Sequence, residues 1–202
     1  MIAIIDYGVG NLFSLSSSLS FLGLDCRVTS RKEDLEDADK IILPGVGAFG
    51  DAMERLIKTG LVDTIREQAE KKPLLGICLG MQLLFEKSYE YGEHEGLGLI
   101  RGVVAPLAAD INPDLKVPHM GWNSLHIIKD DPIFRYFRNG ELVYYVHSYY
   151  AKNCKESTLG VSQYDVPVAG LVRSGLVYGA QFHPEKSGDA GLRLLRGFAD
   201  LY

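Results

Sequence analysis

Cysteine is scarce in this chain of 202 residues, which has only three, at positions 26, 78 and 154. An odd number of widely spaced cysteines argues against a disulfide framework, and no pair has the Cys-x-x-Cys spacing of a structural metal site. We therefore expect free thiols, neither metal nor cofactor, and a reducing cytoplasm as the location. Cys26 and Cys154 are interpreted as structural.

Long apolar runs and an excess of positive charge are also absent. No segment is apolar for the length that crosses a bilayer, and Asp6 follows the first apolar residues too early for a signal peptide. The net charge of −5 offers no basic surface for nucleic acid and no cationic stripe for a membrane. Repeats, low-complexity tracts and linkers are missing too, so residues 1–202 are expected to form one domain.

The first half of the chain alternates short apolar runs with helical patterns. The expected strands are residues 2–5, 26–29, 40–43 and 73–77, and the expected helices are residues 12–22, 48–58, 62–70 and 81–86. Strands that alternate with helices predict an α/β fold with a doubly wound, mainly parallel sheet flanked by helices.

The second half has a different pattern, in which turns separate successive strand signals. The expected strands are residues 103–107, 124–128, 142–147, 159–164, 168–172 and 176–182, and a helix is expected at residues 190–201. We interpret these as additional antiparallel strands and a final helix that covers the sheet.

Cys78 has an unusual setting among the cysteines. It stands in Gly76-Ile77-Cys78-Leu79-Gly80, directly after an apolar run and directly before a helical pattern. This is the pattern of a nucleophile elbow, in which flanking glycines make room for a strained backbone. The N–H groups that open the helix favour a thiolate. The alternative is an inert core cysteine, but the glycine frame favours a thiol enzyme.

A base and an acid stand far downstream, where His183 and Glu185 flank Pro184. The proline ring favours an extended conformation at His183. In extended backbone, residues two apart share a face, so Glu185 can orient the imidazole as the acid of a catalytic triad does. The alternatives are a core or metal histidine and a solvated acid, although no partner at metal-ligand spacing accompanies His183.

Pro44-Gly45-Val46-Gly47 follows another expected strand. Its glycines would let backbone N–H groups approach a reacting oxygen, as an oxyanion hole requires. The N–H of Leu79, next to the nucleophile, would be a second donor. A plain strand-to-helix turn is the alternative.

Three of these segments follow expected strands, and the carboxyl ends of parallel strands meet at one edge of a sheet. We therefore expect Cys78, residues 44–47 and residues 183–185 to lie on one rim. Residues 8–11, by contrast, lack the third glycine of a dinucleotide fingerprint, because Phe13 stands there, and are interpreted as a turn capped by Asn11.

Two aromatic segments complete the candidates. Pro118-His119-Met120-Gly121-Trp122-Asn123 holds the only tryptophan, and is either a partly buried turn before a strand or a docking surface. Residues 144–150 alternate as a strand does, and their aromatic rings are interpreted as packing.

Together these residues resemble the class I, triad-type glutamine amidotransferases. The class is marked by the cysteine elbow followed by Met81-Gln82-Leu83, and by His183-Pro184-Glu185. A narrower resemblance, to the glutaminase subunits of imidazole glycerol phosphate synthase, covers nearly the whole chain. It rests on Asp6-Tyr7-Gly8-x-Gly10-Asn11, Pro44-Gly45-Val46-Gly47, the segment 118–123, Tyr145-x-His147-Ser148-Tyr149 and the segment 181–187.

The resemblance implies that the chain hydrolyses L-glutamine to glutamate and ammonia without a cofactor. The ammonia would pass to a (β/α)8-barrel cyclase partner in a heterodimer, which forms imidazole glycerol phosphate and AICAR in histidine biosynthesis. Cys78 would attack the amide, His183 would transfer protons, and Glu185 would orient His183.

The resemblance also implies roles for residues around this triad. Gly45, Val46, Gly47 and Leu79 would form the oxyanion hole; Gln82, His147, Ser148 and Tyr149 would bind glutamine; and Asn11, His119, Met120, Trp122, Tyr144 and Lys186 would contact the partner. The strand 45–47 is expected to rest with a carbonyl facing the site and to flip a peptide once the synthase is occupied.

Other functions fit the same residues. The ammonia could serve another synthase, which aminates a nucleotide or a surface sugar. A stand-alone cysteine hydrolase of γ-glutamyl peptides would use the same elbow and His-x-Glu pair. A non-catalytic regulatory module is disfavoured, because the set Cys78, His183 and Glu185 is complete. The lack of a P-loop or a second domain indicates a subunit that makes ammonia for another protein.

Overall fold

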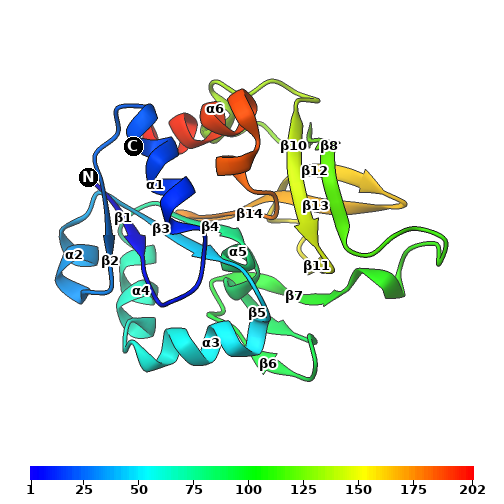
Figure 1. Cartoon of the computed structure of the whole chain (residues 1–202), viewed down its shortest axis with the longest axis horizontal. Coiled ribbons are helices and arrows are strands. Elements are labelled where there is room, and N and C mark those ends of the chain that lie inside the picture. Colours follow the sequence, from blue (N-terminus) through cyan, green and yellow to red (C-terminus); the bar gives the residue numbers. More distant parts are fainter.

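A mixed eight-stranded sheet forms the centre of the protein in a computed structural model that describes all 202 residues (Figure 1). Its strands are β1 (Ile2–Ile5), β2 (Cys26–Thr29), β3 (Lys40–Gly45), β4 (Leu74–Cys78), β9 (His126–Ile127), β12 (Thr158–Tyr164), β13 (Val166–Ser174) and β14 (Val177–Ala180). Their order is β2-β1-β3-β4-β14-β13-β12-β9. Neighbours from β2 to β14 pair in parallel and the remaining neighbours pair antiparallel.

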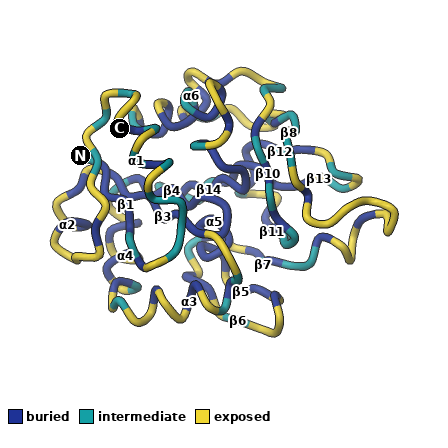
Figure 2. Tube along the Cα trace, in the orientation of Figure 1, coloured by how far each residue is buried: buried dark blue, intermediate teal, exposed yellow.

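Helices cover both faces of this sheet, which confirms the doubly wound architecture. One face packs against α1 (Leu12–Phe21) and α6 (Gly188–Ala199), and the other against α3 (Phe49–Lys58) and α4 (Val62–Ala69). The short helices α2 (Lys32–Asp37) and α5 (Leu79–Leu83) complete the set. Figure 2 shows the central strands buried between exposed helix surfaces. No helix is both long and apolar enough to cross a membrane.

Two smaller sheets extend the second half of the chain. One has the order β11-β7-β5-β6, with β5 (Phe85–Ser88), β6 (His94–Glu95), β7 (Ile100–Pro106) and β11 (Tyr149–Lys152). The other is an antiparallel ribbon of β8 (His119–Ser124) and β10 (Leu142–His147). Three short 3-10 helices, η1 (Leu107–Ala109), η2 (Pro132–Phe134) and η3 (Pro184–Lys186), join these elements.

Most of the expected elements are present, and the differences have physical causes. The helix expected at residues 81–86 ends at Leu83, because Phe85 is fully buried and begins β5 beside Ile100. Residues 119–124 form strand β8, which pairs with β10, and are not a turn before a strand. The helix α2 and the short strands β5, β6 and β11 were not predicted, because each is too short to show a clear period.

The elbow is held by two close backbone approaches. A Cβ added to Gly80 would lie 1.9 Å from the carbonyl oxygen of Leu43 in β3, and one added to Gly76 would lie 2.6 Å from the carbonyl oxygen of Gly80. No side chain fits at such distances. The two glycines therefore let the first turn of α5 pack directly onto β3 and β4, as the sequence pattern predicts.

We expect Gly80→Ala to lower the free energy of unfolding by about 3 kcal/mol or more, because the methyl group would have to displace the Leu43 carbonyl. Gly60→Ala is the matched control: Gly60 has a φ of +73° and no neighbour within 4 Å of an added Cβ. It should cost only about 1 kcal/mol of backbone strain. Urea unfolding followed by circular dichroism measures both free energies of unfolding. Equal decreases for the two variants would show that the close packing at Gly80 does not exclude a side chain.

Candidate active site

The three segments singled out in the sequence meet at the carboxyl ends of adjacent strands. β3, β4 and β14 are neighbours, with Gly45 beside Cys78 and Ala180 beside Ile77. Cys78 ends β4, the oxyanion segment begins at the end of β3, and His183 follows β14. The expected common rim is confirmed, and it is the topology of the sheet that brings these distant residues together.

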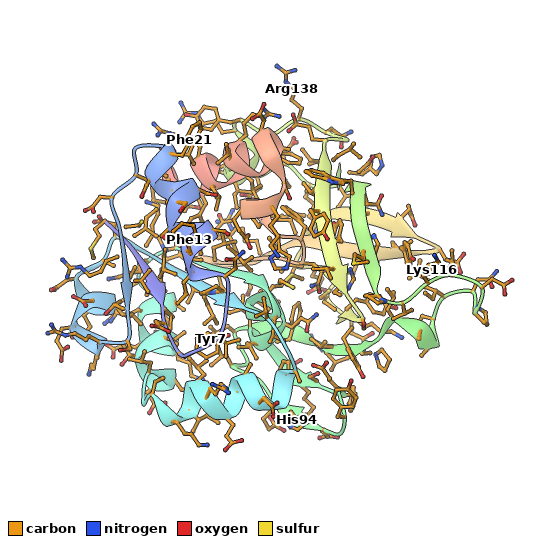
Figure 3. The ribbon with its side chains drawn as sticks, viewed as in Figure 1. Tyr7, Phe13, Phe21, His94, Lys116 and Arg138 are labelled. Atoms are coloured by element: carbon orange, nitrogen blue, oxygen red, sulfur yellow. The ribbon has the colours of Figure 1, made fainter.

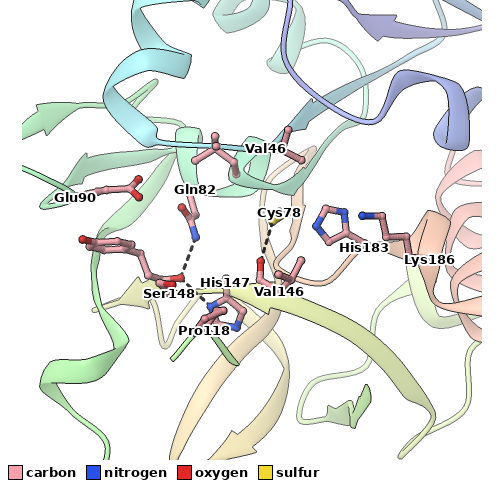
Figure 4. A pocket seen from close by; sticks show the side chains of 13 residues that line it. Val46, Cys78, Gln82, Glu90, Pro118, Val146, His147, Ser148, His183 and Lys186 are labelled. Atoms are coloured by element: carbon pink, nitrogen blue, oxygen red, sulfur yellow. Dashed lines mark hydrogen bonds between the residues drawn. The ribbon is translucent and has the colours of Figure 1, made fainter. Parts of the chain in front are cut away.

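Cys78 has the strained backbone of an elbow, with φ at +54° and ψ at −112°. A positive φ is unusual for a residue with a side chain and is maintained here by the packing of α5 on β3. Only 7% of the residue is exposed. Its Sγ lies 4.0 Å from the carbonyl oxygen of Val146 (Figure 4). It also lies 3.9 Å from Nε2 of Gln181.

His183 and Glu185 form the expected pair, with 2.8 Å between His183 Nδ1 and Glu185 Oε1. The backbone differs from the prediction: His183 is extended, but Glu185 lies in η3, so a tight turn and not a shared strand face brings the two groups together. The segment is anchored to β10, because the His183 N–H donates to the Tyr144 carbonyl at 2.9 Å. Ser187 Oγ donates to the His183 carbonyl at 2.6 Å and accepts from the Tyr144 N–H at 2.9 Å.

The charge state of His183 follows from its two neighbours. Burial by itself lowers the pKa of His183, but hydrogen bonding and charge attraction from Cys78 and then from Glu185 raise it to about 9. The other ring nitrogen, Nε2, is buried and makes no hydrogen bond of standard geometry, so it is free to face a reacting group. His183 is thus placed as a cation beside the Cys78 side chain (Figure 4).

A cavity of about 310 Å³ opens in front of Cys78. It is lined by Val46, Gly47, Cys78, Leu79, Gln82, Glu90, Pro118, Val146, His147, Ser148, Tyr149, His183 and Lys186. Figure 4 shows His183 and Lys186 on one side of the sulfur and Gln82 on the other. The structure thus gathers the triad nucleophile and base, most of the expected oxyanion segment and all the expected glutamine-binding residues around one space.

The oxyanion segment is fixed at one end and adaptable at the other. The Tyr7 hydroxyl donates to the Pro44 carbonyl at 2.8 Å, and Gly45 packs against α5. Gly47, by contrast, has a φ of +95° and nothing within 4 Å of an added Cβ. Because Gly47 has no side chain and accepts either sign of φ, it permits the backbone change that a peptide rotation between Val46 and Gly47 requires.

Gln82 has a fixed amide orientation. Its Nε2 donates to the Tyr149 carbonyl and to Oε1 of Gln181, both at 3.0 Å. Because a backbone carbonyl can only accept, the nitrogen of Gln82 must point to Tyr149 and the oxygen is left for another donor.

Two residues close to Cys78 or its cavity were not named as site residues from the sequence. Glu90 is buried, lines the cavity and accepts a hydrogen bond from the Phe49 N–H at 2.7 Å; burial raises the pKa of its carboxyl group. Gln181 is fully buried between Gln82 and Cys78. Glu90 lies in a loop without a periodic pattern, so nothing signalled it, whereas Gln181 stands beside Phe182 and His183 and its position was a usable signal.

The residues expected to contact a partner occupy different environments. Met120 and Trp122 on β8 are 65% and 55% exposed, Trp122 packs edge-on against Tyr144, and Lys186 is exposed at the cavity. His119 differs from the expectation, because only 3% of it is exposed and it cannot reach a partner directly.

Asn11 caps α1 as predicted, accepting from the Ser14 N–H at 3.4 Å, and lines a small cavity beside Glu185. The same residue thus orders the helix start and borders the triad. Elsewhere, no group of three His, Cys, Asp or Glu side chains is placed to hold a metal ion.

Comparison with solved structures places the fold. A crystal structure of a glutamine amidotransferase superposes with a TM-score of 0.77 at 23% identity, covering 99% of this chain and 98% of the other. A chain in the structure of PurLQS from Thermotoga maritima superposes with a TM-score of 0.77 at 21% identity, covering 98% and 97%. At these identities the likeness concerns the fold alone.

Comparison of sequences is more specific. The family described as glutamine amidotransferase class-I matches residues 3–200. Imidazole glycerol phosphate synthase subunit HisH of Caldanaerobacter subterraneus is 47% identical, with 100% of this chain and 98% of the relative covered. The HisH subunits of Listeria monocytogenes and Bacillus cytotoxicus are 49% and 50% identical, covering 100% and 98% of this chain and 96% and 93% of the relatives. The chain therefore belongs to the class I glutamine amidotransferases and, within them, to the HisH subunits of imidazole glycerol phosphate synthase.

Proposed function

We propose that this chain hydrolyses L-glutamine at Cys78 and delivers the ammonia to a (β/α)8-barrel cyclase subunit, which makes imidazole glycerol phosphate and AICAR in histidine biosynthesis. The observation that carries the proposal is the buried set Cys78, His183 and Glu185 at the head of a cavity sized for an amino acid. The membership in the HisH family supports the destination of the ammonia. A free thiolate nucleophile suits a reducing cytoplasm.

The first half-reaction forms a thioester. The Cys78 thiolate attacks the side-chain amide carbon of glutamine, and the carbonyl oxygen becomes an oxyanion as the C–S bond forms. His183, held as an imidazolium, then gives its Nε2 proton to the amide nitrogen, so that the C–N bond breaks and ammonia leaves. Glu185 holds the other ring nitrogen throughout.

The second half-reaction restores the enzyme. Neutral His183 removes a proton from water, and the resulting hydroxide attacks the thioester carbon. The C–S bond breaks, glutamate leaves, and the thiolate and imidazolium are present again. The side chain is released as the carboxylic acid, which gives its proton to solvent or to ammonia, so protons and charge balance over the two steps without a cofactor.

Backbone groups stabilise the oxyanion in this scheme. The Leu79 N–H lies directly after the nucleophile at the start of α5, and the segment Gly45–Gly47 lies beside it through the pairing of β3 with β4. We assign one donor to each of these two segments, the second becoming available when a peptide in Gly45–Gly47 turns its N–H into the cavity.

Recognition of the amino-acid end of glutamine falls to the far side of the cavity. The carboxylate of Glu90 is buried there and suits an α-ammonium group, and the free oxygen of Gln82 accepts from the same group. His147, Ser148 and Tyr149 form the wall between them. A site with such groups selects free glutamine over an apolar amide.

The partner surface is proposed around the mouth of the cavity. Met120 and Trp122 project from β8, and Phe13 on α1 is 82% exposed (Figure 3). Tyr144 supports Trp122, while Lys186 and Asn11 lie closer to the triad. Exposed aromatic and methionine side chains beside a reaction centre are typical of a protein interface.

Glutamate release from glutamine tests the proposal directly. We expect slow release by the chain alone and a rise of at least about a hundredfold when the cyclase and its nucleotide ligand are added, because completing the oxyanion hole is worth that much. Cys78→Ala is the blank. Rapid glutamate release at a rate that the cyclase does not change would favour a stand-alone hydrolase. Stimulation by a different synthase would show that the ammonia goes to another acceptor.

The charge pair of the mechanism predicts the titration of His183. In the native protein the imidazolium should persist to a pH of about 9, and Cys78→Ala should lower this pKa because burial and Glu185 alone then act on the ring. NMR of ring-labelled histidine measures both values. The folded pKa lies above the ordinary 6.5, so the pair stabilises the fold fully below pH 6.5 and ceases to do so as pH rises through 9. A native His183 that titrates below 6.5 would contradict the assignment.

Gly47→Ala tests the adaptable end of the oxyanion segment. Alanine disfavours the positive φ of +95° by about 1–2 kcal/mol, which shifts the segment away from its resting backbone. If the resting state is the inactive one, release of glutamate by the isolated chain should rise about 5- to 30-fold while stimulation by the loaded cyclase shrinks. Gly23→Ala, with φ at +70° and open space, controls for general strain. A fall in both rates would show instead that the present backbone is the active one.

A further inference from the structure

A continuous line of hydrogen bonds, buried at its centre, runs from strand β8 to the wall of the glutamine cavity. Asn123 Nδ2 lies 3.2 Å from His119 Nε2, and His119 Nδ1 lies 2.9 Å from His147 Nε2. His147 Nδ1 lies 2.9 Å from the Tyr149 carbonyl oxygen. His119 and His147 face each other across the β8–β10 ribbon, where they are paired in register.

A backbone carbonyl at each end of this line determines which atom donates and which accepts in every hydrogen bond between them. The Tyr149 carbonyl only accepts, so His147 carries its proton on Nδ1 and its Nε2 must accept. At the other end Asn123 Nδ2 also donates to the Gln163 carbonyl at 2.9 Å, so this atom is the amide nitrogen and His119 Nε2 must accept from it. His119 therefore carries its proton on Nδ1 and donates to His147. Both ends impose the same tautomer on both rings.

Burial keeps the two rings neutral. His119 is 3% exposed and stacks between the rings of Tyr145 and Tyr164, at centroid distances of 4.6 and 4.2 Å. His147 is 6% exposed. Burial lowers the pKa of His119 to about 4 and that of His147 to about 3. A second proton would have to bind Nε2 of either ring, where it would face the N–H group that already donates to that nitrogen. Both rings therefore stay neutral, and neither takes up the proton that His183 transfers.

The line ends at a shared acceptor. The Tyr149 carbonyl that accepts from His147 also accepts from Gln82 Nε2 at 3.0 Å. Gln82 in turn donates to Gln181, whose Nε2 points at the sulfur of Cys78. The position of this one carbonyl therefore determines which way the Gln82 amide faces. Through Gln181 it also determines the position of an N–H group directed at the Cys78 sulfur.

We propose that His119 and His147 are positioning residues for glutamine binding, which hold the Tyr149 carbonyl and with it the amide of Gln82 in the orientation that accepts the substrate. The inference rests on the function proposed above. His119 adjoins the exposed Met120 on β8. The line of hydrogen bonds therefore begins beside the proposed partner surface and ends at the substrate pocket.

Simple core packing is the competing explanation, and the chemistry of the line argues against it. An apolar ring at position 119 would keep the stack between the tyrosines, yet it would leave His147 Nε2 buried without a donor. A buried polar group that loses its partner costs free energy and tends to rearrange. A structural role alone would therefore lower stability, whereas the proposed positioning role would also weaken glutamine binding in the folded protein.

His119→Phe separates the two explanations, because it retains an aromatic ring and removes the donor. In the complex with the loaded cyclase we expect the KM for glutamine to rise about 5- to 30-fold, with kcat changed less than about threefold. His119→Asn places an amide N–H near the position of Nδ1 and should recover most of the KM. His126→Phe is the matched control, since His126 is exposed on β9 and outside the line.

NMR of histidine labelled with nitrogen-15 tests the direction without any variant. Both His119 and His147 should appear as neutral Nδ1–H tautomers from pH 8 down to about 5, and His119→Phe should shift the His147 signals while leaving those of His94 and His126 in place. An Nε2–H tautomer at His147, or an unchanged KM in folded His119→Phe, would overturn the proposal.

A variant that fails to fold still leaves a decisive measurement. In that case His119→Ala is assayed with and without added imidazole, which can refill the space between the tyrosines; a KM that imidazole does not lower would overturn the proposal. Failure of the proposed function would look different, because the native chain and His126→Phe would then release no glutamate with the loaded cyclase.

Discussion

The approach of α5 to β3 is the contact on which the rest of the site depends. Because Gly80 has no side chain, the first turn of α5 lies against the Leu43 carbonyl. That position brings the Leu79 N–H beside the segment Gly45–Gly47 and keeps Cys78 at a positive φ. The strain at Cys78 is therefore balanced by close backbone packing in the centre of the sheet.

Three histidines near one cavity are assigned opposite states by their surroundings. His183 has a carboxylate on one side and sulfur on the other, which outweigh burial and keep it charged. His119 and His147 have only neutral donors and acceptors, so burial prevails and both stay neutral. These opposite environments suit the roles proposed above, proton transfer for His183 and hydrogen bonding for His119 and His147.

The sequence predicted the parallel half of the fold better than the antiparallel half. Strands such as β1 and β4 are buried on both faces and appear as continuous apolar runs, so their bounds are visible without the structure. Strands such as β5 and β8 are only partly buried, so neither appears as a continuous apolar run. The pattern at residues 81–86 looked helical, although Phe85 pairs with Ile100 and begins β5. Glu90 could not be predicted either, because its proposed role depends on the cavity around it and not on a local sequence pattern.

The sequence by itself determined the chemistry: a cysteine between glycines after a strand, and a histidine two residues before a glutamate, specify a thiol nucleophile and its base through local backbone geometry. Only the tertiary structure decided how these groups act together. Sheet order placed β3, β4 and β14 side by side, η3 in place of an extended strand brought Glu185 to His183, and the β8–β10 pairing buried His119 beside His147. The physical reason is that strand pairing and burial join residues far apart in the chain, and no local pattern records which partners they will meet.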